Sequence, residues 1–223
     1  QVPRDFHNLV YKVWESMKLY TGIERGLYIN IEKNIPVAAG LAGGSSNAAA
    51  AFKAINQLWD LNLPLEELMK LGSSIGADIP FCLMGGTALA RGIGEELTPL
   101  KALKGVNILI CTPEIEISTA YAYEGLDLKG ERLATDALIE AIEKQDLRGI
   151  AKNLGNKMET FIIKENPLIE EIKETMIEEG ALASLMSGSG PSVFGIFQDP
   201  YEIELAQEKL LKRFKQTYIC KTI

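Results

Sequence analysis

One run of small residues in this sequence has the composition of a phosphate-binding loop. Positions 36–46 read PVAAGLAGGSS and lead directly into a run of alanines, which are strong helix formers. The first amides of a helix lack partners within the helix, and the helix dipole adds partial positive charge at the same place. Small side chains let the backbone approach a ligand closely. We therefore expect anionic phosphate to bind at this helix N-terminus without a lysine in the loop.

The loop differs from two common nucleotide-binding motifs. It contains neither the Gly-Lys-Ser/Thr end of a Walker loop nor the G-x-G-x-x-G of a dinucleotide fingerprint. A simpler alternative is a tight turn before an alanine-rich helix, with Ser45 as the N-cap. The number of small residues exceeds what such a turn needs, and this favours the phosphate loop.

Asp78 is a candidate general base. It lies in the segment GADIPFCL among apolar residues, and Pro80 prevents this segment from forming a long helix. Phosphoryl transfer depends mainly on positioning and on charge stabilisation, so one carboxylate beside one phosphate loop is a sufficient arrangement. The alternative is that this carboxylate only caps a short turn.

A second small-residue loop, SGSGP, occupies positions 187–191. Alone it would be read as a hairpin turn, but two such loops in one chain favour the hypothesis that both approach the same anion. Tyr121 and Tyr123, considered without further context, would be packing residues.

The elements that must position these residues follow from the hydrophobic periodicity. We expect a helix over 8–21, a half-buried strand over 27–32, a helix after the loop and another over 64–73. Strands are expected over 87–91, 95–98 and 106–111. Helices over 135–144, 147–156, 167–179 and 201–214 follow, together with strands over 183–186, 192–197 and 218–222. This is an α+β chain. The expected elements change near Pro113 from mixed helices and strands to mainly helices, which predicts two domains, 1–112 and 113–223.

Composition excludes several classes of protein. The net charge of −7 leaves no basic surplus to bind nucleic acid, and no run of eighteen apolar residues is present to span a membrane. The three cysteines, Cys82, Cys111 and Cys220, are widely spaced without a zinc-site pattern, so we expect buried reduced thiols.

Together these segments resemble the GHMP kinase superfamily. The resemblance rests on GLAGGSSNAAA, GADIPFCLMGGTALARGIGEELTPL, STAYAYEGLD and MSGSGPSVFGIF, and it covers essentially the whole chain. Within the superfamily these segments look like the branch that uses ATP to phosphorylate the 2-hydroxyl of diphosphocytidyl methylerythritol. The resemblance implies a cytoplasmic, monomeric or homodimeric kinase of isoprenoid synthesis, with a two-part fold and the substrate in the cleft between the parts.

The resemblance also implies roles for individual residues. Asp78 would be the base, Thr119 and Tyr123 would bind the substrate, and the ring of Tyr123 would stack on cytosine. Ser46 would bind Mg²⁺, and the second loop, Ser187, Gly188, Ser189 and Gly190, would support the phosphate loop. Two ATP-binding residues, Asn8 and Lys33, would contact the adenosine part. The others would wrap the phosphates: Pro36, Val37, Ala38, Ala39, Gly40, Leu41, Ala42, Gly43, Gly44, Ser45 and Ser46.

Members of this branch begin with a strand that carries a lysine and an asparagine, followed by a Gly-Tyr-His stretch that grips cytosine. No such stretch precedes the first helix here, so we expect a chain of only these residues to be inactive, although the parent protein is a kinase. Two alternatives stay open: a non-catalytic nucleotide-binding module, and a kinase of homoserine or mevalonate.

Overall fold

The computed structural model describes residues 2–126 and 132–223. The chain divides into two compact units, one comprising Gln1–Val37 and Ala42–Pro99, the other Ala38–Leu41 and Leu100–Ile223. This division comes earlier than the expected boundary at 112–113, because strand β3 (Asn107–Thr112) pairs with strands of the second unit. The domain limits 1–112 and 113–223 stay a prediction.

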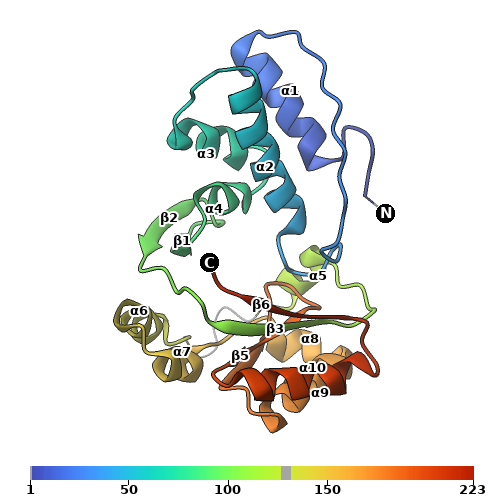
Figure 1. Ribbon diagram of the computed structural model, residues 1–223, viewed down its shortest axis with the longest axis vertical. Helices are drawn as coiled ribbons and strands as arrows, with labels where there is room; N and C mark the ends of the chain where they lie inside the picture. Colours follow the sequence, from blue (N-terminus) through green and yellow to red (C-terminus); the bar gives the residue numbers. More distant parts are fainter. Residues whose placement is uncertain (1, 127–131) are drawn as a thin grey trace. The chain divides into compact units, whose positions relative to one another are not determined.

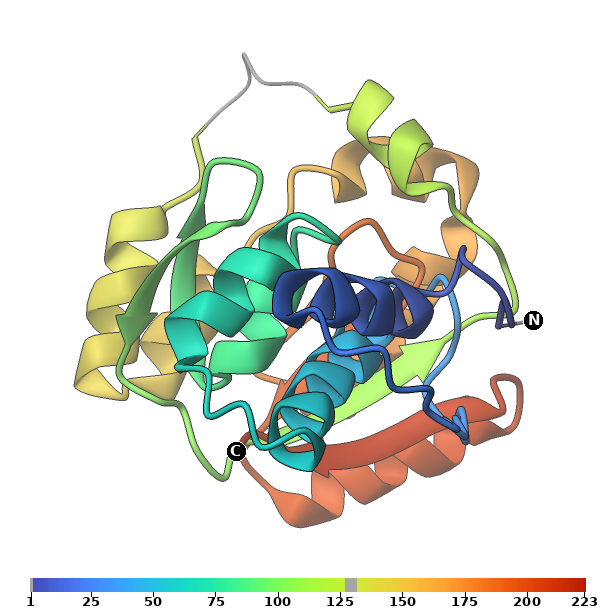
Figure 2. The same cartoon turned by 90° about the horizontal axis from the view of Figure 1, so that it is seen from above.

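The first unit is a group of helices followed by a two-stranded sheet. It contains α1 (Leu9–Thr21), α2 (Gly43–Leu58), α3 (Leu65–Ser73) and α4 (Ile79–Met84), and then β1 (Thr87–Arg91) and β2 (Glu96–Leu100). Helix α1 lies alongside α2, and α4 packs against both α2 and α3 (Figure 1, Figure 2). The largest fully buried side chains of this core are Val13, Met17, Phe52, Ile79 and Leu83.

Local sequence signals explain where these helices begin and end. The side chain of Asn8 caps α1, and Gly22 ends it in the left-handed conformation, with φ of 71°. Pro80 lies in the first turn of α4, where its missing amide costs nothing. The helix ends after six residues at Gly85, which has φ of 72°. The expected helices over 8–21 and 64–73 are confirmed.

The prediction of a strand over 27–32 is wrong. The structure has no strand here, and the Tyr28 side chain is 95% exposed. Alternating apolar residues form a strand only when a neighbouring strand supplies backbone hydrogen bonds. Within the described ranges, the two sheets consist of other segments, and none of them pairs with 27–32.

The second unit is built on a four-stranded antiparallel sheet with the strand order β4-β5-β3-β6. Besides β3 it contains β4 (Ala183–Met186), β5 (Val193–Phe197) and β6 (Gln216–Lys221). The helices α9 (Pro167–Glu178) and α10 (Pro200–Leu211) pack together against this sheet, and α10 runs along β6 (Figure 2). Their core includes Leu109, Ile172, Met176, Val193 and Phe197, all buried.

In the described part of this unit there are also four shorter helices: α5 (Thr119–Glu124), α6 (Thr135–Lys144), α7 (Leu147–Asn153) and α8 (Glu159–Glu165). The sequence prediction includes α6 and α7 but omits α5 and α8, which have six and seven residues and are too short to show helical periodicity. Among the described helices, none has the length and apolar character needed to cross a membrane.

Candidate active site

The small-residue loop bends into α2 through left-handed backbone. Ala38, Gly40 and Ala42 have φ of 52°, 70° and 48°, and α2 begins at Gly43. The N-cap is Ala42, which has no side chain able to bond the first amides of the helix. The alternative that Ser45 is the N-cap is therefore wrong, because Ser45 is a buried residue of the first turn. The amides at this helix N-terminus are not bound by a side-chain cap, so they can donate hydrogen bonds to a bound anion.

A lysine ammonium is buried beside that helix N-terminus. No described residue accepts a hydrogen bond from the Lys33 Nζ atom, and the atom is inaccessible to solvent. It lies so close to Gly43 that a Cβ added there would stand 2.6 Å from it. Burial lowers the pKa of Lys33, because the charged form is poorly solvated. A buried cation without a partner is costly, and a bound anion would remove that cost.

The two small-residue loops lie against each other within the second unit. The Ser187 hydroxyl donates to the carbonyl oxygen of Gly40 at 2.8 Å, and the Ser192 amide donates to that of Ala39 at 3.3 Å. The approach requires glycine, since a Cβ on Gly40 would stand 2.1 Å from the Ser187 carbonyl oxygen. The structure thus brings together two loops that the sequence prediction paired.

Asp78 immediately precedes α4 in the first unit. Asp78 is exposed, and its side chain makes no capping hydrogen bond to α4. The alternative role as a turn cap thus has no support here, and the carboxylate is available to a ligand. Burial, and then the negative charge of Asp78, raise the pKa of the nearby Cys82 thiol.

Helix α5 carries the two residues expected at the substrate. The hydroxyl groups of Thr119 and Ser189 are 3.3 Å apart, which connects α5 to the second loop. The two tyrosines of this helix differ: Tyr121 packs against Phe161 with ring centroids 5.0 Å apart, whereas Tyr123 is 61% exposed. Packing therefore accounts for Tyr121, and the ring of Tyr123 is free to stack on a planar ligand.

Two other expected ligand residues have different surroundings. Asn8 uses its side chain for the helix cap, accepting from the Val10 amide at 2.9 Å and donating to the Pro3 carbonyl at 2.7 Å. Ser46 is exposed on the first turn of α2. Within the described part of the chain, no group of three or more His, Cys, Asp or Glu side chains is arranged to hold a metal ion.

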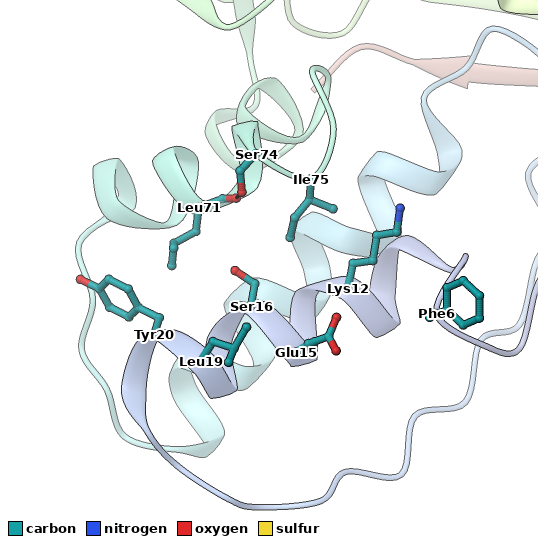
Figure 3. Close-up of a pocket in the computed structure, with 9 residues that line it drawn as sticks. All are labelled: Phe6, Lys12, Glu15, Ser16, Leu19, Tyr20, Leu71, Ser74 and Ile75. Atoms are coloured by element: carbon teal, nitrogen blue, oxygen red, sulfur yellow. Dashed lines mark hydrogen bonds between the residues drawn. The ribbon is translucent and has the colours of Figure 1, made fainter.

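The first unit also has an open groove of about 620 Å³ between α1 and the end of α3 (Figure 3). None of the expected site residues lines it. Its lining consists of Phe6, Lys12, Glu15, Ser16, Leu19, Tyr20, Leu71, Ser74 and Ile75.

Comparison with known proteins connects these features to a family. Residues 8–86 match the model of the GHMP kinases N terminal domain, and residues 138–216 match that of the GHMP kinases C terminal. The chain is 45% identical over 221 residues to 4-diphosphocytidyl-2-C-methyl-D-erythritol kinase of Clostridioides difficile, covering 98% of this chain and 75% of the relative. The enzyme of that name from Caldicellulosiruptor saccharolyticus is 46% identical over 223 residues, covering 99% of this chain and 77% of the relative.

Solved structures agree with this assignment. The crystal structure of 4-(cytidine 5'-diphospho)-2C-methyl-D-erythritol kinase matches with a TM-score of 0.85 and 32% identity, over 99% of this chain and 80% of that one. Homoserine kinase from Cytophaga hutchinsonii matches with a TM-score of 0.81, but its 22% identity shows only a shared fold. The chain belongs to the GHMP kinase family, and it is an enzyme with the mixed helix and sheet fold of that family.

Proposed function

We propose that this protein transfers the γ-phosphoryl group of ATP to the 2-hydroxyl of 4-diphosphocytidyl-2-C-methyl-D-erythritol. The relatives named for that substrate are 45–46% identical over nearly the whole chain, far above the 22% of the homoserine kinase. The observation that carries the proposal is the buried Lys33 ammonium, which has no partner among the described residues and lies beside the uncapped N-terminus of α2.

The phosphate loop supplies the binding energy for ATP in this proposal. The amides at the start of α2 donate to phosphate oxygens, and the Lys33 ammonium neutralises part of their charge. The resemblance implies that Lys33 contacts the adenosine end of the nucleotide; this proposal places Lys33 at the phosphate end instead. Asn8 would contact the adenosine through its backbone, because its side chain is engaged in the cap of α1.

The chemical step needs a base and a charge stabiliser. Asp78 would accept the proton of the attacking hydroxyl, since its carboxylate is exposed and free of the helix that it precedes. Tyr123 would stack on the cytosine and Thr119 would orient the substrate, while the second loop would hold the phosphate loop in place.

Magnesium would accompany the nucleotide. Mg²⁺ is commonly held by one or two protein oxygens together with substrate phosphates, and it keeps several waters. The exposed Ser46 hydroxyl on the first turn of α2 fits such a site, because a cation arriving with ATP needs few ligands from the protein. When bound, the cation would offset the charge of the transferring phosphoryl group.

The proposal is tested on the purified parent protein at its full natural length, with ATP and three alcohols: diphosphocytidyl methylerythritol, homoserine and mevalonate. We expect formation of ADP with the first alcohol alone. Formation of ADP with either of the others would assign a different substrate. Calorimetric binding of an ATP analogue without turnover of any alcohol would identify a non-catalytic nucleotide-binding module. Tyr123→Ala should raise KM for the cytidine substrate about fivefold or more, since stacking of a base contributes about 1–3 kcal/mol.

A further inference from the structure

One asparagine side chain makes two hydrogen bonds to the second small-residue loop and the strand that leads into it. Asn156 lies between α7 and α8, outside the residues expected from the sequence. Its Nδ2 group donates to the Met186 carbonyl at 2.9 Å and to the Gly188 carbonyl at 2.8 Å. Its Oδ1 atom accepts from the Met158 amide at 2.9 Å, which fixes the orientation of the side-chain amide. Both donors of one side chain are thus committed to the loop and its entry strand.

A largely buried ion pair between Glu159 and Lys173 also holds Met186, at the end of the strand that leads into the loop. The Glu159 Oε1 atom accepts from the Met186 amide at 2.6 Å, and Oε2 lies 3.2 Å from the Lys173 ammonium. The side chains of Glu159 and Lys173 are only 13% and 17% exposed, so water competes weakly with these contacts. We refer to Asn156, Glu159 and Lys173 as the loop brace.

The side-chain contacts add to the loop's own backbone hydrogen bonds. Gly188 and Gly190 have φ of 55° and 81°, and the turn is closed by the Ser187 amide donating to the Ser192 carbonyl at 2.8 Å and the Gly190 amide donating to the Ser187 carbonyl at 2.9 Å. On its other side the loop holds the phosphate loop through the Ser187–Gly40 hydrogen bond. The brace and the phosphate loop therefore contact the same short segment, which transmits the position of one to the other.

We infer that Asn156 and Glu159 are positioning residues for ATP, acting through the loop at 187–190 on the backbone of Gly40. Neither side chain needs to touch the nucleotide. The inference rests on the proposed function, in that Gly40 belongs to the loop that binds ATP. Loss of the brace should weaken nucleotide binding and leave the affinity for the alcohol substrate nearly unchanged.

The main test is Asn156→Asp, with Asn153→Asp as the matched control. The variant at 156 keeps the acceptor for the Met158 amide but replaces both donors with a carboxylate facing two carbonyl oxygens. Asn153 also donates through Nδ2, at 2.8 Å, but to the Gly149 carbonyl within α7. For Asn156→Asp we expect KM for ATP to rise about tenfold or more, with KM for the alcohol within about twofold of wild type. The control should leave both constants unchanged.

Hydrogen exchange of residues 187–192, measured by mass spectrometry, gives an independent readout. Exchange should accelerate in Asn156→Asp and not in Asn153→Asp. Glu159→Gln keeps an acceptor for the Met186 amide but loses the ion pair, so it should raise KM for ATP and accelerate exchange by smaller amounts. If Asn156→Asp does not fold, Glu159→Gln decides between the two outcomes.

Two failures are distinguishable. A wild-type protein that binds an ATP analogue but phosphorylates none of the alcohols contradicts the proposed reaction, and the brace is then judged by the dissociation constant of the analogue. Wild-type KM or Kd for nucleotide in folded Asn156→Asp and Glu159→Gln, with unchanged exchange, overturns the inference.

Discussion

The Ser187 hydroxyl donates a hydrogen bond of 2.8 Å to the carbonyl oxygen of Gly40, across 147 positions of sequence. This bond joins two loops that have no regular secondary structure of their own and that carry most of the small residues of the candidate site. Because the donor is a side chain and the acceptor is backbone, the contact constrains the path of the phosphate loop rather than the rotamer of a side chain.

Gly40→Ala should disrupt this contact. The added Cβ would stand 2.1 Å from the Ser187 carbonyl oxygen, and Gly22→Ala is the matched control, since Gly22 has nearly the same φ (71° against 70°) with nothing within 4 Å of its Cβ position. The left-handed backbone alone costs alanine about 1–2 kcal/mol, and the clash should add about 1–3 kcal/mol at position 40. Urea unfolding measures both variants. Equal destabilisation of the two would show that the loops do not approach this closely.

Lys33→Met should stabilise the free protein and weaken nucleotide binding. Removing a buried ammonium that has no described partner should raise the free energy of unfolding by about 1–3 kcal/mol. The affinity for an ATP analogue should fall about tenfold. The matched control is Lys53→Met, because Lys53 is an exposed lysine on α2. Thermal unfolding and calorimetry measure the two effects, and a variant that is both less stable and unchanged in affinity would contradict the assignment.

The same lysine predicts a pH dependence. The pKa of Lys33 is lowered in the folded protein, so between that value and 10.5 the unfolded chain holds the proton more tightly. Stability of the wild type relative to Lys33→Met should therefore rise with pH through this window. Urea titrations of both proteins at several alkaline pH values measure the difference, which a fully solvated lysine would not produce.

Asp78→Asn should abolish turnover and keep the fold. A missing general base typically lowers kcat by about 10²–10⁴, whereas the carboxylate makes no capping bond whose loss would destabilise α4. KM for ATP should stay within about threefold of wild type. Asp136→Asn, in the first turn of α6, is the control for the change of charge. A kcat near that of wild type would remove Asp78 from the mechanism.

Cys111 should make the protein less stable at alkaline pH. Burial raises the pKa of this thiol from 9.0 to about 11. The folded state thus retains the proton longer, and stability falls as pH rises from about 9 to about 11. The loss attributable to this group is about 2–3 kcal/mol, and Cys111→Val should lack it. Parallel pH dependences of wild type and variant, followed by urea unfolding, would show that the thiol does not titrate in this way.

Sequence patterns predicted most of the fold because most elements carry their own signals. The helix at 9–21 has an Asn cap and a terminal glycine, and the strands β3, β4 and β5 are short apolar runs bounded by turn residues. The strand prediction for 27–32 was wrong because alternating apolar residues specify which side chains share one face of a strand but do not supply a partner strand. The short helices α5 and α8 were missed because six or seven residues do not make a periodic pattern.

The site was less accessible to sequence reasoning than the fold. Small residues identified both loops, but only the structure shows that Ser187 contacts Gly40 and that the Lys33 ammonium is buried at the start of α2. Asn156 had no signal at all, because a bridging amide looks like any loop asparagine until its two acceptors are known.

The compact units interleave along the chain: Ala38–Leu41 belongs with the second unit, although the residues on both sides of it belong with the first. A fragment ending at Pro99 would keep these four residues and lose Ser187 and Ser192, which hold their carbonyl groups. Cutting the protein at that point therefore removes both hydrogen bonds to the Ala39 and Gly40 carbonyl groups. The phosphate loop thus depends on residues from both parts of the sequence.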